Sequence, residues 1–421
     1  MVGTMAKIDD SVKKKVPELR FKGFTDDWEE RKLSSGLREY TDRVIVEDDK
    51  EYYQISVRNN FGGITLRGSK MGNKIGRKRQ AKINLTKYPQ TLIFTRQTVE
   101  QGGIGWVDKY CDGAIVTENM PTISLDTSVF SKYFLTNLFQ TRIFYKNAIL
   151  DNVEGGSAQI AIHESKFLSS TLLFPNLDEQ EKIGQFFKQL DDTIDLHQRK
   201  LDLLKEQKKG FLQKMFPKNG AKIPELRFAG FADDWEERKL GEFSDVRDGT
   251  HASPKYVSQG HPMVTSKNLT HSGLDMTDVS FLTDEDFNEI NKRSKVSIGD
   301  ILFGMIGTIG NPVIVDRDDF AIKNVALIKE KTSNPITNKW LLQYLKSPSF
   351  NQFIQKENAG GTQKFIALGL IRDMKLRVPE FDEQQKIGAF FKKIDETITL
   401  HQRKLDLLKE QKKGFLQKMF V

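Results

Sequence analysis

The chain has 421 residues, of which 38% are hydrophobic and 29% are charged, so it is long enough for two or three globular domains and too apolar for a disordered chain. Its 65 Lys and Arg exceed its 57 Asp and Glu, and the formal charge of +8 modestly favours a polyanionic partner without identifying one. The single cysteine excludes an internal disulfide framework and a cysteine-rich metal site. No stretch approaches the roughly 18 apolar residues of a membrane span, so we expect a cytoplasmic protein with no membrane partner.

Two blocks of sequence occur twice along the chain. After a polar, lysine-rich extension over residues 1–16, Pro17–Leu33 (PELRFKGFTDDWEERKL) recurs as Pro224–Leu240 with two changes, at an offset of 207 residues. A longer block, Asp178–Phe216, recurs as Asp382–Phe420 with six changes in 39 positions, at an offset of 204. Between the blocks the two halves differ almost completely. The chain is therefore predicted to be two half-molecules in tandem, in which a fixed frame brackets two large variable regions.

The strongest local signal in the first variable region is Phe61–Gln90, which carries eight basic residues and no acidic one. Its five glycines favour a loop, and a basic loop of this kind approaches phosphates closely and neutralises several of them. The alternative is a solvated basic loop without a ligand. The basic residues are Arg67, Lys70, Lys74, Arg77, Lys78, Arg79, Lys82 and Lys87.

The two variable regions share a faint plan. Tyr88–Leu125 has a strand, glycine turn, strand pattern that returns at Ser297–Ile328. A Gly-Gly turn precedes each long repeated block, at Gly155–Gln159 and again at Gly360–Gln363, and a helical stretch and a short strand follow it. Each variable region is therefore predicted to mix α and β structure.

The long repeated block predicts a helix with a heptad seam. The seam positions of the first copy are Ile183, Phe187, Leu190, Ile194, His197, Leu201, Leu204, Lys208, Phe211 and Met215, and the second copy repeats them from Ile387 to Met419. At 1.5 Å per residue each helix would reach about 58 Å. We expect antiparallel packing, because a parallel pair would require the chain to return the whole helix length through the second variable region. The polar seam residues His197, His401, Lys208 and Lys412 are interpreted as register-setting or solvent-reaching side chains, not as ligands.

The second variable region lacks a basic run but contains short polar loops with base-reading side chains. Asn and Gln pair with adenine, whereas Arg and Lys pair with guanine. Each loop alone also matches an ordinary turn, so only their joint presence favours nucleic-acid binding. The loops are Asp248–Tyr256 (DGTHASPKY), Thr265–Asn268 (TSKN), Lys292–Lys295 (KRSK) and Gly360–Lys364 (GGTQK).

Motifs for catalysis are missing from the sequence. The adenine methyltransferase signature [DN]-P-P-[FYW] is absent, and the nearest string, Asn311-Pro312-Val313, lacks the second proline and the aromatic residue. There is no G-x-x-x-x-G-K-[ST] phosphate loop, and the six histidines have no zinc-binding spacing. The sequence thus predicts no catalytic residue, no metal and no cofactor in this chain.

The W-E-x-x-K/R-L strings (Trp28–Leu33 and Trp235–Leu240), the D-E-Q-x-K-I-G helix starts and the two-fold plan resemble the specificity subunits of type I restriction-modification systems over essentially the whole chain. The resemblance implies an α+β chain with two mixed α/β target-recognition domains, separated by two long antiparallel coiled-coil helices in an internal pseudo-two-fold repeat. Each domain would read one half of a bipartite site in double-stranded DNA. The helices would set the unread gap and dock two adenine-N6 methyltransferase (modification) subunits.

Other activities of such systems would belong to partners. Restriction subunits with ATP-driven translocation and nuclease activity would join the core, in defence against foreign DNA. S-adenosylmethionine, ATP and Mg²⁺ would be bound by the partner subunits, so this chain alone would not be an enzyme. The expected domains are an N-terminal extension over 1–16, target-recognition domain 1 over 17–177, a first spacer helix over 178–216, a linker over 217–223, target-recognition domain 2 over 224–381 and a second spacer helix over 382–421.

By resemblance, the DNA-facing residues of the second region lie in its polar loops, and Tyr53–Asn59 (YQISVRN) stands in the first region where TSKN stands in the second. Phosphate contacts are expected from Lys70, Lys74, Arg77, Lys78 and Arg79, and positions near the bases from Arg96, Gln97 and Gln159. The remaining candidates are Arg58 in the first region and Thr250, His251, Ser253, Lys255, Ser266, Lys267, Asn268, Lys292, Arg293, Thr362, Gln363 and Lys364 in the second.

Two other functions compete with this interpretation. A stand-alone restriction or modification enzyme with an unfamiliar site is disfavoured by the missing motifs. A spacer protein with two protein-binding heads is disfavoured by the acid-free basic segment Phe61–Gln90, whose charge suits DNA.

Overall fold

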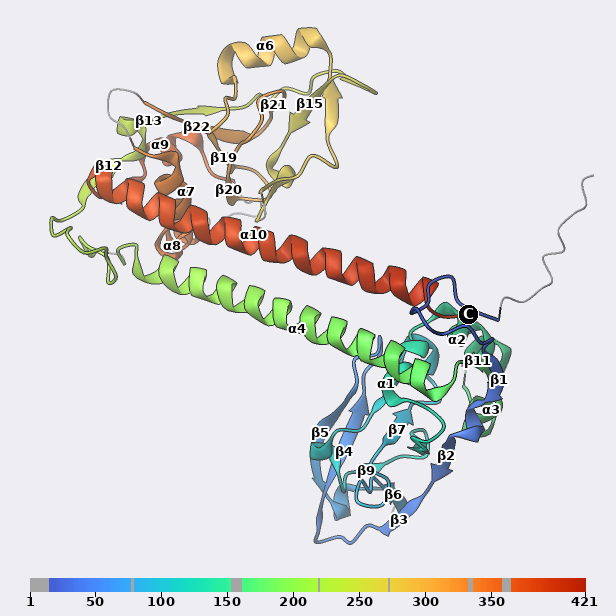
Figure 1. Cartoon of the computed structure of the whole chain (residues 1–421). Helices are drawn as coiled ribbons and strands as arrows, with labels where there is room; N and C mark the ends of the chain where they lie inside the picture. The colour runs from blue at the N-terminus through green and yellow to red at the C-terminus, as the bar shows by residue number, and fades with distance from the viewer. Residues whose placement is uncertain are drawn as a thin grey trace, which may run out of the picture. The chain divides into compact units, whose positions relative to one another are not determined.

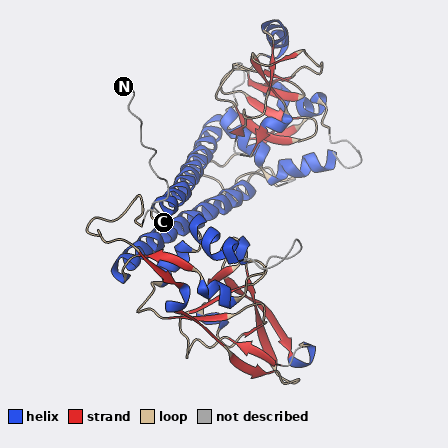
Figure 2. Cartoon of the chain, turned by 90° about the vertical axis from the view of Figure 1, so that its right-hand side faces the viewer, coloured by secondary structure: helices blue, strands red, loops and turns tan. Residues whose placement is uncertain are grey.

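The computed structural model describes residues 15–76, 79–152, 161–218, 220–271, 273–331, 336–357 and 365–421. The chain divides into two compact units, and each of them combines helices and strands (Figures 1 and 2). Unit 1 comprises Met1–His197 with Lys404–Val421, and unit 2 comprises Gln198–Arg403. The boundary crosses both long helices, so each unit contains one variable region and a stretch of each helix. The expected two-domain α+β fold is confirmed.

The described residues of unit 1 form three sheets. β1 (Glu29–Lys32) pairs with β11 (Thr171–Phe174). A four-stranded sheet has the order β2-β10-β7-β8, with β2 at Leu37–Tyr40, β10 at Thr122–Leu125, β7 at Thr91–Phe94 and β8 at Ile104–Trp106. A five-stranded sheet has the order β3-β6-β9-β4-β5, with β3 at Asp42–Ile45, β6 at Arg79–Lys82, β9 at Ile115–Val116, β4 at Glu51–Val57 and β5 at Ile64–Met71. The helices are α1 (Lys132–Leu138), α2 (Arg142–Phe144), α3 (Glu164–Ser169), the first part of α4 (Leu177–Lys214) and the last part of α10 (Phe381–Lys418).

Unit 2 repeats the first two sheets. β12 (Glu236–Lys239) pairs with β23 (Lys375–Val378), and a four-stranded sheet has the order β13-β22-β19-β20, with β13 at Ser244–Asp248, β22 at Val325–Glu330, β19 at Ile301–Gly304 and β20 at Gly310–Ile314. A second four-stranded sheet follows the order β14-β18-β15-β21, at Tyr256–Val257, Ser280–Leu282, His261–Val264 and Ala321–Ile322, and β16 (Leu269–Thr270) forms a hairpin with β17 (Gly273–Leu274). The helices are the last part of α4, then α5 (Leu240–Phe243), α6 (Asp284–Ser294), α7 (Asn338–Lys346), α8 (Pro348–Glu357), α9 (Leu368–Asp373) and the first part of α10 (Phe381–Lys418).

The shared plan of the variable regions is confirmed at the level of strand pairing. The predicted strand, glycine turn, strand segments are β7 with β8 and β19 with β20, and both pairs are antiparallel. The residues of the two predicted Gly-Gly turns lie outside the described residues; after them, α3 precedes β11 and α9 precedes β23. Sequence identity has been lost between the variable regions, but the sheet order β2-β10-β7-β8 matches β13-β22-β19-β20 strand for strand.

The two long helices pair antiparallel within each unit. In unit 1, the Phe186 and Phe415 rings lie 5.0 Å apart, and Lys412 Nζ lies 2.7 Å from Asp191 Oδ1. In unit 2, the Phe211 and Phe390 rings lie 4.9 Å apart, and Lys208 Nζ lies 2.6 Å from Asp395 Oδ1. As residue numbers rise along α4, the numbers of the contacting residues on α10 fall, which defines an antiparallel pair. The two seam lysines form cross-helix ion pairs, which is the register-setting arrangement expected of polar seam positions.

The ends of the long helices complete the cores of the variable regions. The core of unit 1 includes Phe187 from the start of α4 and Phe420 from the end of the chain, which is 3% exposed. The core of unit 2 includes Phe391 from the start of α10 and Phe216, which follows α4 and is 2% exposed. Each core therefore depends on both copies of the long repeated block.

One expectation about local structure was wrong. The segment Phe61–Gln90 is not an open loop, because β5, a 3-10 turn at Gly72–Lys74 and β6 occupy much of it. The residues EYYQISV of β4 provide an antiparallel partner for β5, from Glu51 opposite Met71 to Val57 opposite Ile64. Gly68 does not open a loop in this hairpin. Its φ is 127°, and it lies where the pairing register between the two strands shifts.

Candidate nucleic-acid interface

The basic candidates of unit 1 lie on the β4–β5 hairpin. Arg58 directly follows β4, Lys70 lies in β5 and Lys74 ends the 3-10 turn, and all three are exposed. Among the described residues none of them forms an ion pair, so their charge is available to an anionic partner. Arg79 begins β6, whereas Arg77, Lys78 and Gln159 lie outside the described residues.

Arg96, expected near the bases, is held by a carboxylate. Its Nη2 lies 2.6 Å from Glu164 Oε2, and its side chain is 21% exposed. It lines a cavity of about 380 Å³ together with Glu39, Arg43 and Gln80, between the two larger sheets of unit 1. Desolvation and the nearby Glu164 raise the pKa of Glu39, whereas Arg96 opposes this shift. Gln97, the next residue, is exposed. Of these two candidates, Gln97 has the freer side chain, and Arg96 would have to exchange Glu164 for a base.

In unit 2, the side chains of His251 and Arg293 both contact Asp248, the last residue of β13. His251 Nε2 lies 2.9 Å from Asp248 Oδ2, and Arg293 Nη2 donates to Asp248 Oδ1. The other ring nitrogen of His251, Nδ1, lies 2.7 Å from the Asn324 Oδ1 atom. Both imidazole nitrogens therefore face oxygen acceptors, and only the protonated ring donates to both. The hydrogen bonds with Asn324 and Asp248 raise the pKa of His251.

This Asp248 cluster presents two basic side chains at the surface. The side chains of Arg293 and His251 are 66% and 51% exposed, whereas that of Asp248 is 10% exposed. Asn324 sits between β21 and β22 in the left-handed region, with φ of 57°, where asparagine is better tolerated than most residues. A buried carboxylate thus orients an arginine and a histidine whose outer atoms remain accessible.

The remaining residues of the DGTHASPKY loop lie beside this cluster. Thr250 Oγ1 accepts a hydrogen bond from Ala252 N and so shapes the loop, and Thr250 forms a backbone bridge with Lys323. Ser253 is exposed, and its Oγ lies 3.2 Å from Lys323 Nζ. Lys255 is exposed, and only its backbone N is fixed, by Asp286. This loop therefore combines hydroxyl groups and cations on one accessible surface.

The TSKN segment does not fit direct contact with bases. Asn268 is 3% exposed, its Oδ1 accepts from Thr265 N, and its Nδ2 donates to the backbone of Asp275 and Asp278. Ser266 is 4% exposed, and its Oγ donates to Asn324 O. These two side chains position the neighbouring turns, because their polar groups are already used inside the fold. Lys267 is exposed and pairs with Asp278.

The last candidates of unit 2 are divided between the surface and the undescribed residues. Lys292 is exposed on α6 and pairs with Glu289, which lies three residues earlier on the same helix. Thr362, Gln363 and Lys364 lie outside the described residues. The structure therefore brings Thr250, His251, Ser253 and Arg293 together and leaves Lys292 as a separate surface charge.

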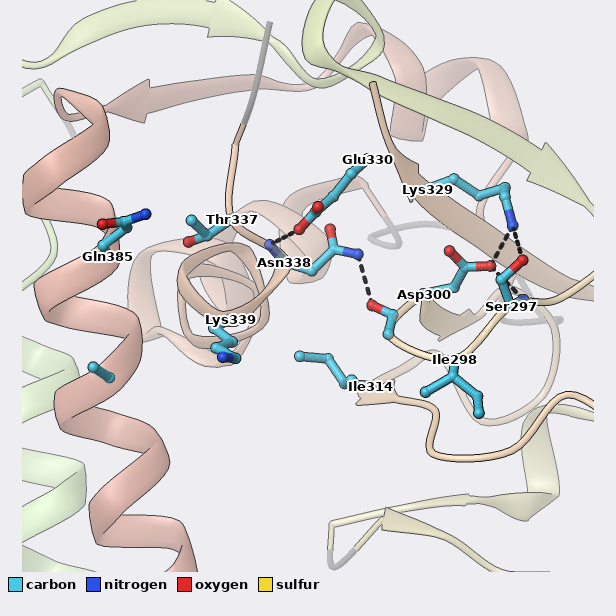
Figure 3. A pocket seen from close by; sticks show the side chains of 12 residues that line it. Ser297, Ile298, Asp300, Ile314, Lys329, Glu330, Thr337, Asn338, Lys339 and Gln385 are labelled. Atoms are coloured by element: carbon cyan, nitrogen blue, oxygen red, sulfur yellow. Dashed lines mark hydrogen bonds and ion pairs between the residues drawn. The ribbon is translucent and has the colours of Figure 1, made fainter. Parts of the chain in front are cut away.

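One cavity of unit 2 contains none of the predicted residues. It measures about 600 Å³ and lies between the sheet strands β20 and β22, α7 and α10 (Figure 3). Two of its charged groups are paired with each other: Lys329 Nζ lies 2.5 Å from Asp300 Oδ2, and it also lies 3.0 Å from Ser297 Oγ. In the described part of the chain, no group of three or more His, Cys, Asp or Glu side chains is placed to hold a metal ion. None of the helices described there is long and apolar enough to cross a membrane.

The chain matches one family of known proteins. The family model described as type I restriction modification DNA specificity domain matches residues 25–206 and 232–410, once in each half of the chain. The chain is 23% identical over 282 residues to the type I restriction enzyme MjaVIII specificity subunit of Methanocaldococcus jannaschii. That alignment covers 64% of this chain and 66% of the relative, just under two thirds of its length.

Solved structures show the same fold at low sequence identity. The S subunit of a type I restriction-modification system from M. genitalium superposes with a TM-score of 0.61 at 15% identity, over 96% of this chain and 99% of that chain. A chain from a structure on complex assembly and conformational transition of the type I R-M system has a TM-score of 0.54 at 17% identity, over 93% and 97%.

Proposed function

Because the chain belongs to the type I restriction modification DNA specificity domain family, we propose that it is the DNA-reading subunit of a cytoplasmic type I restriction-modification complex. Each unit reads one half of a bipartite site in double-stranded DNA. The chain carries no catalysis of its own. Methyl transfer, ATP hydrolysis and cleavage, with S-adenosylmethionine, ATP and Mg²⁺, belong to methyltransferase and restriction subunits that assemble with it.

One observation carries this proposal: the two units share a sheet order but expose different basic side chains. In unit 1 the cations Arg58, Lys70 and Lys74, which form no ion pair among the described residues, lie along a long hairpin. In unit 2 the Asp248 cluster presents Arg293 and His251. A protein that binds one ligand twice would repeat its binding residues along with its frame. Two different surfaces on a repeated frame fit two different base sequences, each contacted through phosphates and base edges.

The exposed leucines of the long helices support docking of two copies of one partner. Leu196 and Leu203 on α4 are 61% and 58% exposed, and their counterparts on α10, Leu400 and Leu407, are 67% and 51% exposed. Within each pair the spacing is seven residues, which is two helical turns and places both leucines on one face. Equivalent apolar faces on the two helices would bind two methyltransferase subunits equivalently. The 38 residues of each helix, about 57 Å long, would also set the unread gap.

The experiment that tests the proposal is a genome-wide map of N6-methyladenine. The chain is co-expressed with a type I methyltransferase subunit that copurifies with it, and the map is compared with that of cells lacking the chain. A new methylated motif in two parts, separated by a fixed unread gap, is the expected result. Absence of a motif although both proteins are soluble and bound to each other would contradict DNA reading and favour a protein-binding spacer.

A further inference from the structure

The β4–β5 hairpin of unit 1 ends in an unusual turn. Arg58 N donates to Gly63 O at 2.9 Å, and Gly62 N donates to Asn59 O at 3.1 Å, so Asn60 and Phe61 form a two-residue loop. Their φ angles are 53° and 56°, which makes this a left-handed turn at both positions, as in a type I′ turn. Such turns favour Asn-Gly, because glycine adopts positive φ without steric cost. Asn60 suits its position, whereas Phe61 is a bulky residue in a conformation that disfavours it.

The surrounding backbone holds this turn in place. Asn60 N donates to Gln101 O at 2.7 Å, and Phe61 N donates to Gly102 O at 3.0 Å. The Asn59 side chain adds a bond from Nδ2 to Gln101 Oε1 at 2.7 Å. A Cβ atom on Gly102 would lie 3.0 Å from Phe61 Cε2, so the ring rests against a position that only glycine leaves open. Strained residues persist when neighbouring structure determines them in this way, and they are concentrated at functional sites.

Packing does not explain why a phenylalanine occupies this position. The Phe61 side chain is 42% exposed and does not belong to the core of unit 1. A second exposed aromatic residue, Tyr110, lies beside the same hairpin: it is 56% exposed, and its Oη donates to Ile64 O at 2.9 Å. Arg58 is close enough to affect the Tyr110 hydroxyl electrostatically, and Lys109 is exposed next to Tyr110. Two aromatic rings and two cations thus share one hairpin end.

We propose that Phe61 is an apolar wedge, which enters a base step of the half-site read by unit 1 while Arg58 and Lys109 bind the flanking phosphates. This inference rests on the proposed DNA-reading function and adds a specificity-determining residue to it. Proteins that deform DNA insert apolar side chains between bases, and the cost of unstacking then depends on the sequence of the step. A rigid turn suits this role, because the ring is fixed before DNA binds. The charge of the site fits DNA better than an apolar protein partner.

The test compares four variants of the full chain, F61G, N60G, F61Y and R58A, in complex with the methyltransferase subunit. F61G removes the ring and creates the preferred Asn-Gly turn, so its Tm stays equal or rises. N60G makes the same exchange one residue earlier and keeps the ring. F61Y keeps an aromatic ring in the same turn. The probe is a duplex carrying the methylated bipartite motif, with 2-aminopurine placed in turn along each half-site to report unstacking.

F61G is expected to weaken binding about 10- to 100-fold, the range seen when aromatic contacts to bases are removed, and to abolish a 2-aminopurine signal confined to one half-site. N60G and F61Y should bind as the unchanged chain does. R58A should instead reduce the slope of log affinity against log salt concentration by about the value of one phosphate contact. F61G should leave this slope unchanged.

Equal affinity and equal 2-aminopurine signals for F61G and the unchanged chain would overturn the wedge. Equal weakening by N60G would also overturn it, because the loss would then come from the turn and not the ring. Both results differ from failure of the proposed function, in which the unchanged chain itself would show no preference for the bipartite duplex.

Discussion

Arg20 and Glu179 form a bidentate ion pair that joins the two repeated blocks of unit 1. Arg20 Nε and Nη2 each donate to a carboxylate oxygen of Glu179 at 2.7 Å, and the Glu179 side chain is 0% exposed. Arg227 and Glu383 repeat the pair in unit 2 at 2.7 and 2.8 Å. A buried carboxylate without its partner is strongly destabilising, so each short block is required wherever the long block occurs. This explains physically why the two blocks are duplicated together.

The variant R20M is expected to destabilise unit 1 by about 3–5 kcal/mol, because it leaves the Glu179 charge buried and unpaired. Urea unfolding followed by tryptophan fluorescence measures the change. D192N removes an exposed ion pair with Lys188, whose atoms lie 2.7 Å apart, and serves as the control. It should change stability by less than about 1 kcal/mol. Similar losses in the two variants would show that the Arg20–Glu179 pair does not hold the blocks together.

Two glycines of α4, Gly184 and Gly210, should respond oppositely to substitution by alanine. A Cβ atom on Gly184 would lie 2.8 Å from Phe134 N, so G184A should force α1 away from α4 and cost on the order of 1–3 kcal/mol. Nothing lies within 4 Å of a Cβ atom on Gly210, and G210A should stabilise its helix by about 0.5–1 kcal/mol. Thermal unfolding of the two variants should therefore shift in opposite directions. Stabilisation by G184A would refute the close approach of the helices.

Lys346 marks a difference between the units. Burial, followed by the charge of Lys208, lowers its pKa to about 8, although Asp395 partly compensates. Alignment of α1 with α7 places Gln140 at the matching position of unit 1, where its Oε1 lies 3.3 Å from Lys412 Nζ. As pH rises, the folded state releases this proton near pH 8, whereas the unfolded chain keeps it up to the ordinary lysine pKa near 10.4. The free energy of unfolding therefore rises between pH 8 and 10.

The variant K346Q should therefore be more stable than the unchanged chain at pH 7, by on the order of 1–3 kcal/mol, and should lose that rise in stability between pH 8 and 10. Unfolding at a series of pH values measures both effects. An unchanged pH profile in K346Q would show that another group titrates there.

The Asp248 cluster predicts a pH dependence of DNA binding through unit 2. Since the hydrogen bonds with Asn324 and Asp248 raise the pKa of His251, the cationic ring is present at lower pH and is lost as pH rises through that pKa. Binding should strengthen a few-fold between pH 8 and 6, with a salt slope steeper by up to about 0.9 for one added phosphate contact. H251Q should remove both changes. The same pH dependence in H251Q would exclude His251 as its source.

Periodicity and repetition made much of the frame predictable, whereas contacts between distant segments were not. The heptad positions from Ile183 to Met215 predicted the helices and, with chain connectivity, their antiparallel pairing. No local pattern relates His251 to Asn324, which lies 73 residues later in the sequence. The burial of Asn268 was also missed, because a polar turn residue has the same local sequence whether its amide faces solvent or the backbone.

The basic hairpin shows a different limit of sequence reasoning. Glycine and lysine in Phe61–Gln90 suggested a loop, but pairing with β4 decides the structure, and pairing is not a local property. Phe61 does not stand out in the sequence, because its turn is held by hydrogen bonds from Asn60 to Gln101 and from Phe61 to Gly102, each 41 residues away, and phenylalanine normally argues against such a turn.

The most direct test of the central claim, that a repeated frame carries two independent DNA readers, is to make both readers the same. Residues 34–170 are replaced by residues 241–374, at junctions where Leu33 N bonds to Ser170 O and Leu240 N bonds to Met374 O at 3.0 and 2.9 Å. With the methyltransferase subunit still bound, the N6-methyladenine map should show a motif containing the unit 2 half-site twice, in inverted orientation, with the gap unchanged. Retention of the original asymmetric motif by this variant would contradict the account.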